Sequence, residues 1–266
     1  MEDLARPMSH DLFDIRGRRA LVTGSSRGIG RALARGLLEA GCTVVLHARD
    51  LDVLKRTARE LAATTAGTDA EIHVAAFDLT DPEAVADGVA AAEHAVGALD
   101  ILINNAGVQH RASLLEFSDD AWRRVLDTNL TSAFLVGRAV ARGMVERRRG
   151  KIINVCSLQA EFARPGIAPY AASKGGLKML TRGMCADWGP LGLQINAIAP
   201  GYFETELTRP LRDDEQFDAW VRARTPAARW GHPDELIGAL LFLASPASDF
   251  VNGQLLFVDG GMSAVV

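Results

Sequence analysis

Seven short apolar segments of this chain alternate with longer segments that have the 3.6-residue period of amphipathic helices. Strands that alternate with helices are typical of βαβ units, in which helices cover both faces of a parallel sheet. We therefore predict an α/β fold: a single doubly wound (Rossmann) domain with a seven-stranded parallel sheet and helices on both faces. The expected strands are RALVTG near Ala20, TVVLHA from Thr43, EIHVAAF from Glu71, DILINN from Asp100, KIINVCS from Lys151, LQINAIAP from Leu193 and QLLFVDGG from Gln254.

The length of the chain and its lack of an internal linker favour one domain. A chain of 266 residues with 48% apolar content can bury one large core, and no linker or repeat divides it. Helix starts are expected at Asp81-Pro82-Glu83 and at His232-Pro233-Asp234-Glu235. We expect residues 1–266 to form one domain, with 1–16 as an N-terminal extension. Residues 202–225, charged and aromatic, form either a cap over a site or a surface helix pair.

Charge and composition exclude several classes of protein. A formal net charge of -4 gives no general attraction to nucleic acid or to an anionic membrane surface. The N-terminal segment lacks the apolar run of a signal peptide, and no segment has the roughly 18 apolar residues of a membrane span. Three widely spaced cysteines indicate reduced thiols. We expect a cytoplasmic protein with no metal centre, no nucleic acid and no membrane among its partners.

The segment TGSSRGIG, from Thr23 to Gly30, lies between the first expected strand and a helix. Its glycines Gly24, Gly28 and Gly30 permit a tight turn, close approach of the backbone to a pyrophosphate, and a helix N-terminus that faces the anion. An ordinary strand-to-helix turn is the alternative, but the position after a strand favours a dinucleotide site.

The end of the second expected strand indicates which dinucleotide is bound. An NAD site usually has an acidic residue about 20 residues after the glycine turn, whereas the 2′-phosphate of NADP needs arginine. Here Arg49 stands near that place, Arg27 adds a second cation, and Ser25 or Ser26 offers a hydroxyl. The sequence therefore favours NADP(H). NAD(H) stays possible, because Asp50 could take the acidic role if the strand is one residue longer.

A group that exchanges a proton is expected close to such a dinucleotide. Tyr170 and Lys174 are four residues apart, so on a helix they share one face. A phenol with a pKa of about 10 becomes a usable acid or base when a lysine cation and an oxidised nicotinamide stabilise its phenolate. Ser157, at the end of an expected strand, can hydrogen-bond the same substrate oxygen, although a lone serine there is more often a cap.

Taken together, these motifs resemble the short-chain dehydrogenase/reductase family. The chain has TGSSRGIG, NNAG at Asn104 to Gly107, Ser157 and YAASK at Tyr170 to Lys174, in the order of that family. The resemblance implies the catalytic set Asn129, Ser157, Tyr170 and Lys174, in which Asn129 anchors a relay water, and it implies a homotetramer. It also implies the following cofactor-binding residues: Gly24, Ser26, Arg27, Gly28, Ile29, Gly30, Arg49, Asp78, Leu79, Asn105, Ala106, Gly107, Tyr170, Lys174, Pro200, Gly201 and Thr205.

The expected substrate is a sugar acid that carries a secondary alcohol or a ketone. Long segments around Tyr170, Pro200 and His232 resemble the branch of the family that acts on hexonates. A carboxylate needs a cation such as arginine, and the expected substrate residues are Arg111, Ser157, Gln159, Arg164 and Tyr170. The alternatives are another short-chain reductase, acting on a 3-oxoacyl-carrier protein or another keto sugar, and a catalytically silent NADP-binding regulator.

Overall fold

The computed structural model describes residues 12–65 and 70–265, and it contains a seven-stranded parallel sheet in the order β3-β2-β1-β4-β5-β6-β7. Each strand begins within one residue of the start expected from the sequence. The strands are β1 (Arg19–Val22), β2 (Thr43–Ala48), β3 (Ile72–Ala76), β4 (Ile101–Asn104), β5 (Gly150–Val155), β6 (Leu193–Pro200) and β7 (Leu255–Val258). The predicted α/β fold is confirmed.

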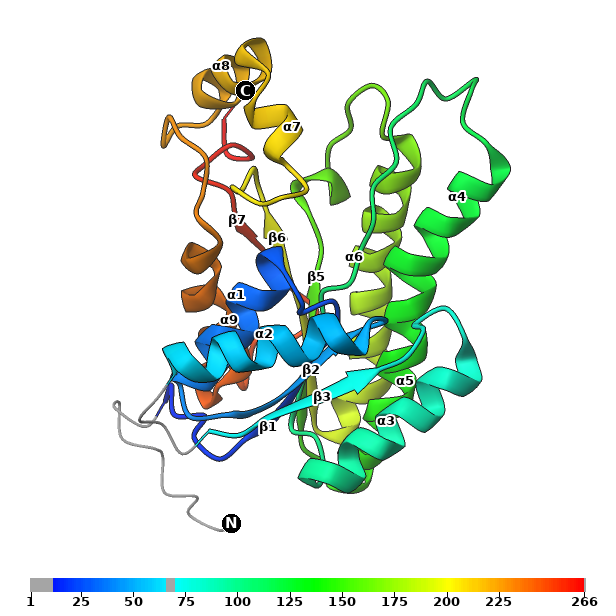
Figure 1. Ribbon diagram of the computed structural model, residues 1–266, viewed down its shortest axis with the longest axis vertical. Coiled ribbons are helices and arrows are strands. Elements are labelled where there is room, and N and C mark those ends of the chain that lie inside the picture. Colours follow the sequence, from blue (N-terminus) through cyan, green and yellow to red (C-terminus); the bar gives the residue numbers. More distant parts are fainter. Residues whose placement is uncertain (1–11, 66–69, 266) are drawn as a thin grey trace.

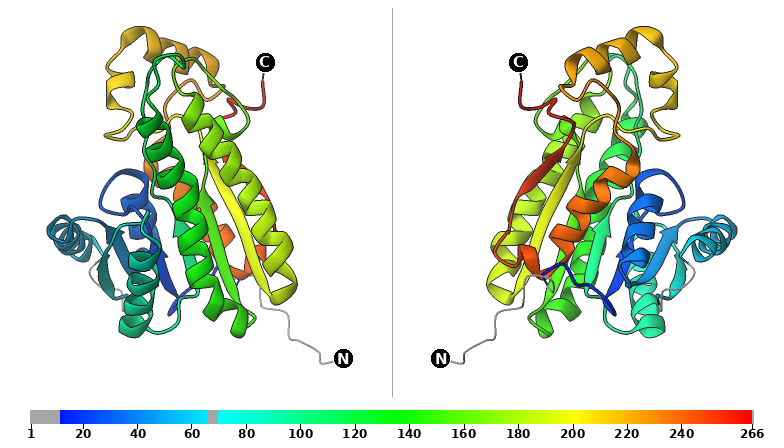
Figure 2. Two further views of the ribbon diagram at one scale, coloured as in Figure 1. Left: turned by 90° about the vertical axis from the view of Figure 1, so that its right-hand side faces the viewer. Right: turned by 90° about the vertical axis from the view of Figure 1, so that its left-hand side faces the viewer.

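Helices cover both faces of this sheet (Figures 1 and 2). One face carries α1 (Gly28–Glu39), α2 (Leu51–Thr64) and α9 (Ile237–Ala244), and the other carries α3 (Pro82–Val96), α5 (Ser132–Glu146) and α6 (Ala168–Trp188). Neighbouring residues of β2 separate the two cores, since Val44 and Leu46 pack in the first and Val45 in the second. Burial on both faces explains why the centre of β2, from Val44 to Leu46, is continuously apolar.

The helix starts confirm their sequence expectations. Asp81 caps α3, and its carboxylate accepts hydrogen bonds from the amides of Glu83 (2.9 Å) and Ala84 (3.2 Å), with Pro82 in the first turn. His232 begins the short 3₁₀ helix η4 (Pro233–Leu236), which leads directly into α9. These caps satisfy backbone donors that have no partner inside the helix.

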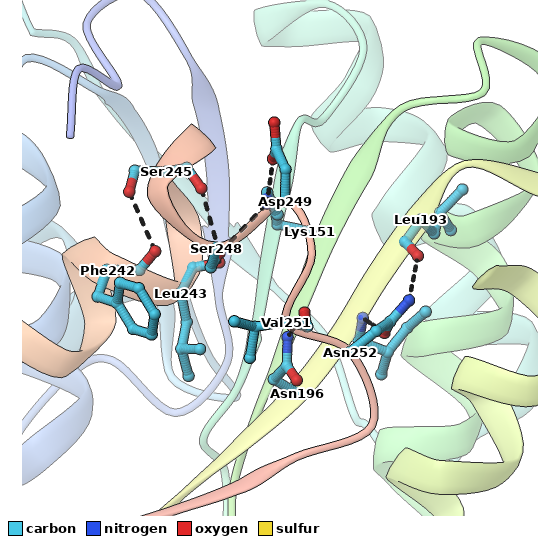
Figure 3. Close-up of polar contacts among 11 residues, drawn as sticks. Lys151, Leu193, Asn196, Phe242, Leu243, Ser245, Ser248, Asp249, Val251 and Asn252 are labelled. Atoms are coloured by element: carbon cyan, nitrogen blue, oxygen red, sulfur yellow. Dashed lines mark hydrogen bonds and ion pairs between the residues drawn. The ribbon is translucent and has the colours of Figure 1, made fainter. Parts of the chain in front are cut away.

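Side-chain amides and a buried lysine fix the return of the chain to the last strand (Figure 3). Lys151 in β5 donates to Asp249 (2.7 Å) and Ser248 (3.2 Å), just after the 3₁₀ helix η5 (Pro246–Ser248). Two asparagines join β6 to the segment that precedes β7: Asn196 Nδ2 donates to the carbonyl of Val251, and Asn252 Nδ2 donates to the carbonyl of Leu193 at 2.9 Å. This network holds the edge strand in register.

The remaining elements lie around the carboxyl ends of the strands, where a doubly wound sheet binds its ligands. The helix α4 (Asp119–Leu126) continues through a π-helical turn, η1 (Asp127–Thr131), into α5. After β6 the chain forms α7 (Arg209–Arg212) and α8 (Glu215–Arg224), which lie above these strand ends in Figure 1. The short 3₁₀ helices η2 (Leu158–Ala160) and η3 (Gly189–Leu191) flank α6.

The N-terminal extension divides into two parts. Residues 1–11 lie outside the described residues. In the described part, Ile15 is buried in the core beside α1, and its carbonyl accepts a hydrogen bond from the Cys42 thiol at 3.2 Å. The carbonyl of Leu12 accepts a bond from the amide of Ala247 at 2.8 Å. Residues 12–16 are thus packed onto the domain.

Candidate active site

The glycine turn between β1 and α1 is the tight turn that the sequence predicted, and its backbone also packs against the end of β4. Gly24 (φ +63°) and Gly28 (φ +55°) adopt the left-handed conformation that favours glycine. A Cβ atom on Gly24 would lie 2.9 Å from Cα of Ala106, and one on Gly30 would collide with the side chain of Asn105 and the carbonyl of Gly24. Only glycine therefore lets these backbones meet.

The turn is joined to the end of the neighbouring strand β4. The Thr23 hydroxyl accepts hydrogen bonds from the amides of Asn105 (3.0 Å) and Ala106 (3.1 Å), while Asn105 Nδ2 donates to the carbonyls of Thr23 (2.9 Å) and Gly24 (3.1 Å). The two motifs TGSSRGIG and NNAG, about 80 residues apart, thus form one rigid unit at the point where the strand order reverses.

His47, in β2, holds the other side of the turn, a role that sequence reasoning missed. Its Nδ1 accepts a hydrogen bond from the amide of Gly24 (3.3 Å), and its Nε2 therefore donates to the carbonyl of Phe77 (3.1 Å). Burial lowers the pKa of His47 to about 4, so the ring is neutral, as this pattern requires. A polar residue within an otherwise apolar strand was the available sign.

A cavity of about 1080 Å³ opens at these strand ends. Every cofactor-binding residue expected from the sequence lines it, from Gly24 to Thr205, together with Ser157. The first turn of α1 contains no acidic residue, so its amides and positive dipole end are available to an anion. The chemistry and shape of these residues fit a dinucleotide: glycines for close approach, a helix N-terminus for the pyrophosphate, and cations at the far end.

The structure separates Arg49 from Asp50 at the end of β2. Arg49 is exposed and lines the cavity. Asp50 caps α2 instead, because its carboxylate accepts bonds from the amides of Asp52 (2.9 Å) and Val53 (3.0 Å). The alternative acidic role for Asp50 is not supported by this geometry.

Further polar groups surround the same end of the cavity. Arg27 lies 3.6 Å from Glu206 and lines the cavity with it. Ser26 also lines it, whereas Ser25 is buried and its hydroxyl accepts a bond from the amide of His47 (2.9 Å). Of the two serines, Ser26 is therefore the one that can contact a ligand. Two hydrogen bonds from Thr80 lower the pKa of Asp78, which stays ionised beside the cavity.

Ser157, Tyr170 and Lys174 meet at the opposite end. Ser157 follows β5 and begins η2, where its hydroxyl accepts from the amide of Gln159 at 3.1 Å. Tyr170 and Lys174 lie one turn apart on α6, with Nζ of Lys174 5.8 Å from the centre of the Tyr170 ring. That amine donates to the carbonyl of Val155 at 2.7 Å, which fixes its position.

Burial has the largest effect on the pKa values of Tyr170 and Lys174. It raises the pKa of Tyr170, and a hydrogen bond from Ser157 opposes the rise. Burial also lowers the pKa of Lys174. The phenol is thus protonated at neutral pH, and it can donate a proton to an oxygen that becomes an alkoxide.

Asn129 lies in the π-helical turn, a geometry that often marks functional sites. Its side-chain oxygen accepts from the amide of Val108 (2.7 Å), and its Nδ2 donates to the carbonyl of Val108 (2.9 Å) and to Ser173 (3.0 Å). Asn129 does not line the cavity. Its side chain connects the segment after β4 to α6, the helix that carries Tyr170.

Arg111, Gln159 and Arg164 lie outside the lining of the main cavity. The loops that carry the two arginines are joined by a bond from the amide of Ala112 to the carbonyl of Gly166 at 3.2 Å. Arg111 is exposed, yet its neighbours partly desolvate it, and this effect together with the charge of Arg164 lowers its pKa. The oxygen of the Gln159 amide is buried and has no partner among the described residues.

The cavity also has two walls outside the family motifs. The first consists of α4 and η1 and was not identified from the sequence. The second runs from the end of β6 into α7 and belongs to residues 202–225, for which the sequence left a cap and a surface helix pair as alternatives. The residues of the two walls are Asp120, Arg123, Arg124, Asp127 and Thr128, and Phe203, Glu206, Leu207, Thr208 and Pro210.

In residues 12–65 and 70–265, no cluster of three His, Cys, Asp or Glu could hold a metal ion. The same residues include no helix long and apolar enough to cross a membrane.

The fold and the site define a class, the oxidoreductases that bind a nicotinamide dinucleotide on a Rossmann domain. A family profile described as enoyl-(acyl carrier protein) reductase matches residues 24–263. With this match and the relatives described next, the chain belongs to the short-chain dehydrogenase/reductase family, whose members use NAD(P).

Two curated relatives match nearly the whole chain. Gluconate 5-dehydrogenase of Gluconobacter oxydans (strain 621H) is 56% identical over 260 residues, which cover 96% of this chain and 99% of the relative. The 5-keto-D-gluconate 5-reductase of Escherichia coli (strain K12) is 50% identical over 258 residues, which cover 97% of this chain and 100% of the relative.

A solved structure has the same fold along its full length. It is a gluconate 5-dehydrogenase from Burkholderia cenocepacia J2315 in complex with NADP and tartrate. It superposes with a TM-score of 0.93 at 52% identity, covering 97% of this chain and 100% of the other. The similarity to gluconate 5-dehydrogenases therefore extends to the whole domain.

Proposed function

We propose that this protein is an NADP(H)-dependent oxidoreductase that interconverts D-gluconate and 5-keto-D-gluconate. The observation that carries the proposal is the meeting of Ser157, Tyr170 and Lys174 with the glycine turn in one cavity. The names of the two curated relatives, at 56% and 50% identity, support the substrate.

The preference for NADP(H) over NAD(H) rests on the end of β2. Arg49 is exposed at the cavity and Arg27 lies in the glycine turn, so two cations can bind a 2′-phosphate. Asp50 is occupied as the cap of α2 and does not line the cavity. The related structure with NADP supports the same preference.

The proton in this reaction is assigned to Tyr170. When bound, the nicotinamide supplies a hydride to the carbonyl carbon or accepts one from the alcohol carbon. In reduction, the Tyr170 hydroxyl donates its proton to the substrate oxygen, and in oxidation its phenolate takes that proton back. Ser157 orients this oxygen, Lys174 favours the phenolate and holds the nicotinamide ribose, and Asn129 anchors a relay water.

The substrate's carboxylate is assigned to the arginines near this group. Arg111 is the first cation after the NNAG segment, Arg164 is the second candidate, and Gln159 offers a polar contact to a polyol. The related structure that contains tartrate, a hydroxy acid with two carboxylates, supports an anionic ligand. Residues 202–225 act as a cap over the substrate in this proposal, and the protein is a cytoplasmic homotetramer.

A reductase that acts on an acyl-carrier protein is the second candidate, because the description of the matching family profile names such a substrate. An acyl carrier is acidic and needs a basic docking face, which the formal net charge of -4 does not favour. Another keto-sugar reductase would use the same catalytic residues.

One assay distinguishes these candidates. Purified protein is mixed with NADPH or NADH and a panel that contains 5-keto-D-gluconate, uncharged ketoses and a 3-oxoacyl thioester, and the reduced nicotinamide is followed by absorbance. We expect the highest kcat/KM with 5-keto-D-gluconate and NADPH. A higher value for the thioester would replace the proposal by its alternative, and no turnover of any substrate would indicate a silent binding protein.

A further inference from the structure

Tyr202 lies two residues beyond β6 and is held by aromatic rings from the segment above the strand ends. Its ring makes edge contacts with Phe217 (5.5 Å between centres) and Trp220 (5.8 Å) on α8, and with Trp230 (5.5 Å). Trp230 is itself fixed, because its indole N–H donates to Asp218 at 2.7 Å. Three edge contacts leave the Tyr202 ring little freedom to turn.

The hydroxyl of Tyr202 is buried, and its proton has no acceptor among the described residues; the Arg164 guanidinium lies close enough to act on its oxygen as a donor. A buried hydroxyl whose proton has no acceptor is costly, and native structures rarely contain one without a reason. Two cations stand near it: Arg164 lies over the Phe217 ring that Tyr202 also contacts, and the Arg111 loop is joined to the Arg164 loop by the bond from Ala112 to Gly166. Burial exceeds their effect and raises the pKa of Tyr202, so the hydroxyl keeps its proton.

The two guanidinium groups have no carboxylate partner, and the phenol proton has no acceptor, among the described residues. Arg164 lies over the ring of Phe217, with its central carbon 5.1 Å from the ring centre, and Arg111 bonds only the side chain of Gln109, at 3.3 Å. Neither guanidinium forms an ion pair with a carboxylate in residues 12–65 and 70–265. Arg164 also lowers the pKa of Arg111, which shows that the two cations repel each other. An anion between them would remove this repulsion and accept the phenol proton.

This group lies beside the residue assigned to proton transfer. Tyr202 stands between Gly201 and Phe203, and both of these neighbours line the same cavity as Tyr170. A ligand that carries both a reacting carbonyl and a carboxylate can therefore reach both tyrosines at once. An uncharged ketone would leave the buried donors unpaired, and a site then discriminates strongly against it.

We propose that the Tyr202 hydroxyl, with Arg111 and Arg164, binds the carboxylate of the substrate and thereby sets the preference for acidic over uncharged substrates. This inference rests on the proposed function for the identity of the substrate, and it adds Tyr202 as a specificity-determining residue. The aromatic contacts connect the same residue to α8, so the carboxylate site and the cap share a side chain.

The test is Tyr202→Phe, which removes the hydroxyl and keeps the ring. We expect KM for 5-keto-D-gluconate to rise by about fivefold to tenfold or more, with kcat nearly unchanged, because the lost bond is to a charged group. KM for an uncharged ketohexose and the Kd of NADPH should not change. Equal changes for charged and uncharged substrates, or no change for either, would overturn the proposal.

A Trp220→Phe variant separates hydrogen bonding from packing, because it alters the same aromatic cluster without removing a buried donor. A similar loss of preference in that variant would assign the effect to packing and overturn the role of the hydroxyl. If the wild-type protein reduces no sugar acid, the proposed function fails, but titration of tryptophan fluorescence with D-gluconate or tartrate still decides the carboxylate site. Weaker binding in Tyr202→Phe supports the site, and equal binding overturns it.

Discussion

The backbone amide of Gly24 donates a hydrogen bond to Nδ1 of His47, 3.3 Å away, and this bond joins the glycine turn to the neighbouring strand. The other ring nitrogen donates to the carbonyl of Phe77 in the segment after β3. A neutral histidine thus connects three consecutive strand ends under the cofactor cavity. A protonated ring would have no lone pair for the Gly24 amide, so the turn depends on the charge state of His47.

The stability of the protein should therefore fall as the pH is lowered. The pKa of His47 is about 4 in the folded chain and 6.5 when unperturbed, so the unfolded chain takes up the proton first. Stability from this group is full above pH 6.5 and is lost as the pH falls from 6.5 to 4, by roughly 3 kcal/mol. Chemical unfolding at several pH values should show that the free energy of unfolding depends less on pH in His47→Gln than in the wild type. His94→Gln, at an exposed position, is the control and should keep the wild-type dependence. An unchanged pH dependence in His47→Gln, or an equal loss of it in His94→Gln, would contradict this.

Glycine at position 24 should be needed for both fold and binding. Gly24→Ala places a Cβ 2.9 Å from the backbone of Ala106 at a φ of +63°, so we expect a loss of about 2 kcal/mol or more and weaker NADPH binding. Gly183, in α6, has no atom within 4 Å of an added Cβ. Gly183→Ala should be neutral or stabilising by up to about 1 kcal/mol. Thermal unfolding compares the two, and similar Tm values would contradict the close approach.

Removal of the Tyr170 hydroxyl should abolish turnover. Tyr170→Phe deletes the ionisable proton and little else, so the folded variant should bind NADPH almost as well as the wild type while kcat falls to background. Fluorescence titration measures the binding, and nicotinamide absorbance measures the rate. Because burial raises the pKa of Tyr170, alcohol oxidation by the wild type should speed up as the pH rises. Substantial activity in Tyr170→Phe would remove the residue from its role.

Arg49 should discriminate between the two dinucleotides. Arg49→Asp replaces a charge-assisted bond to the 2′-phosphate by repulsion, and the lost bond is worth about 1.5–3 kcal/mol. KM for NADPH should therefore rise at least tenfold, whereas KM for NADH should change little. Arg56→Asp makes the same charge change on the exposed face of α2, outside the cavity, and serves as the control. If both cofactors lose affinity equally in Arg49→Asp, the residue does not bind the phosphate.

Arg111 should contribute to the binding of a charged substrate. Arg111→Ala should raise KM for 5-keto-D-gluconate by roughly tenfold or more, if the lost interaction is about 1.5 kcal/mol, and hardly affect an uncharged ketone. Steady-state kinetics on both substrates measure this. Parallel losses would indicate a structural arginine, and no loss for either substrate would transfer the role to Arg164.

The sequence by itself determined the elements and the motifs, because both depend on residues close together in the chain. Burial on both faces makes the strands β2 and β6 mostly apolar, and a turn that needs positive φ requires glycine at positions 24 and 28. The four-residue spacing of Tyr170 and Lys174 similarly places them on one face of a helix, whatever surrounds them. The cofactor residues beyond the glycine turn and Arg49 could be named because the resemblance to the family rests on short local motifs.

Only the tertiary structure decided which groups meet across the sheet. His47 reads as one polar residue in a strand until the fold brings Gly24 and Phe77 to its two nitrogens. The sequence favours Arg49 but leaves Asp50 as an alternative, and a helix cap separates the two. Tyr202 is 38 residues from Arg164 along the chain, and only folding brings both side chains to the ring of Phe217. Such pairings depend on the shape of the whole domain, and no local pattern of residues encodes them.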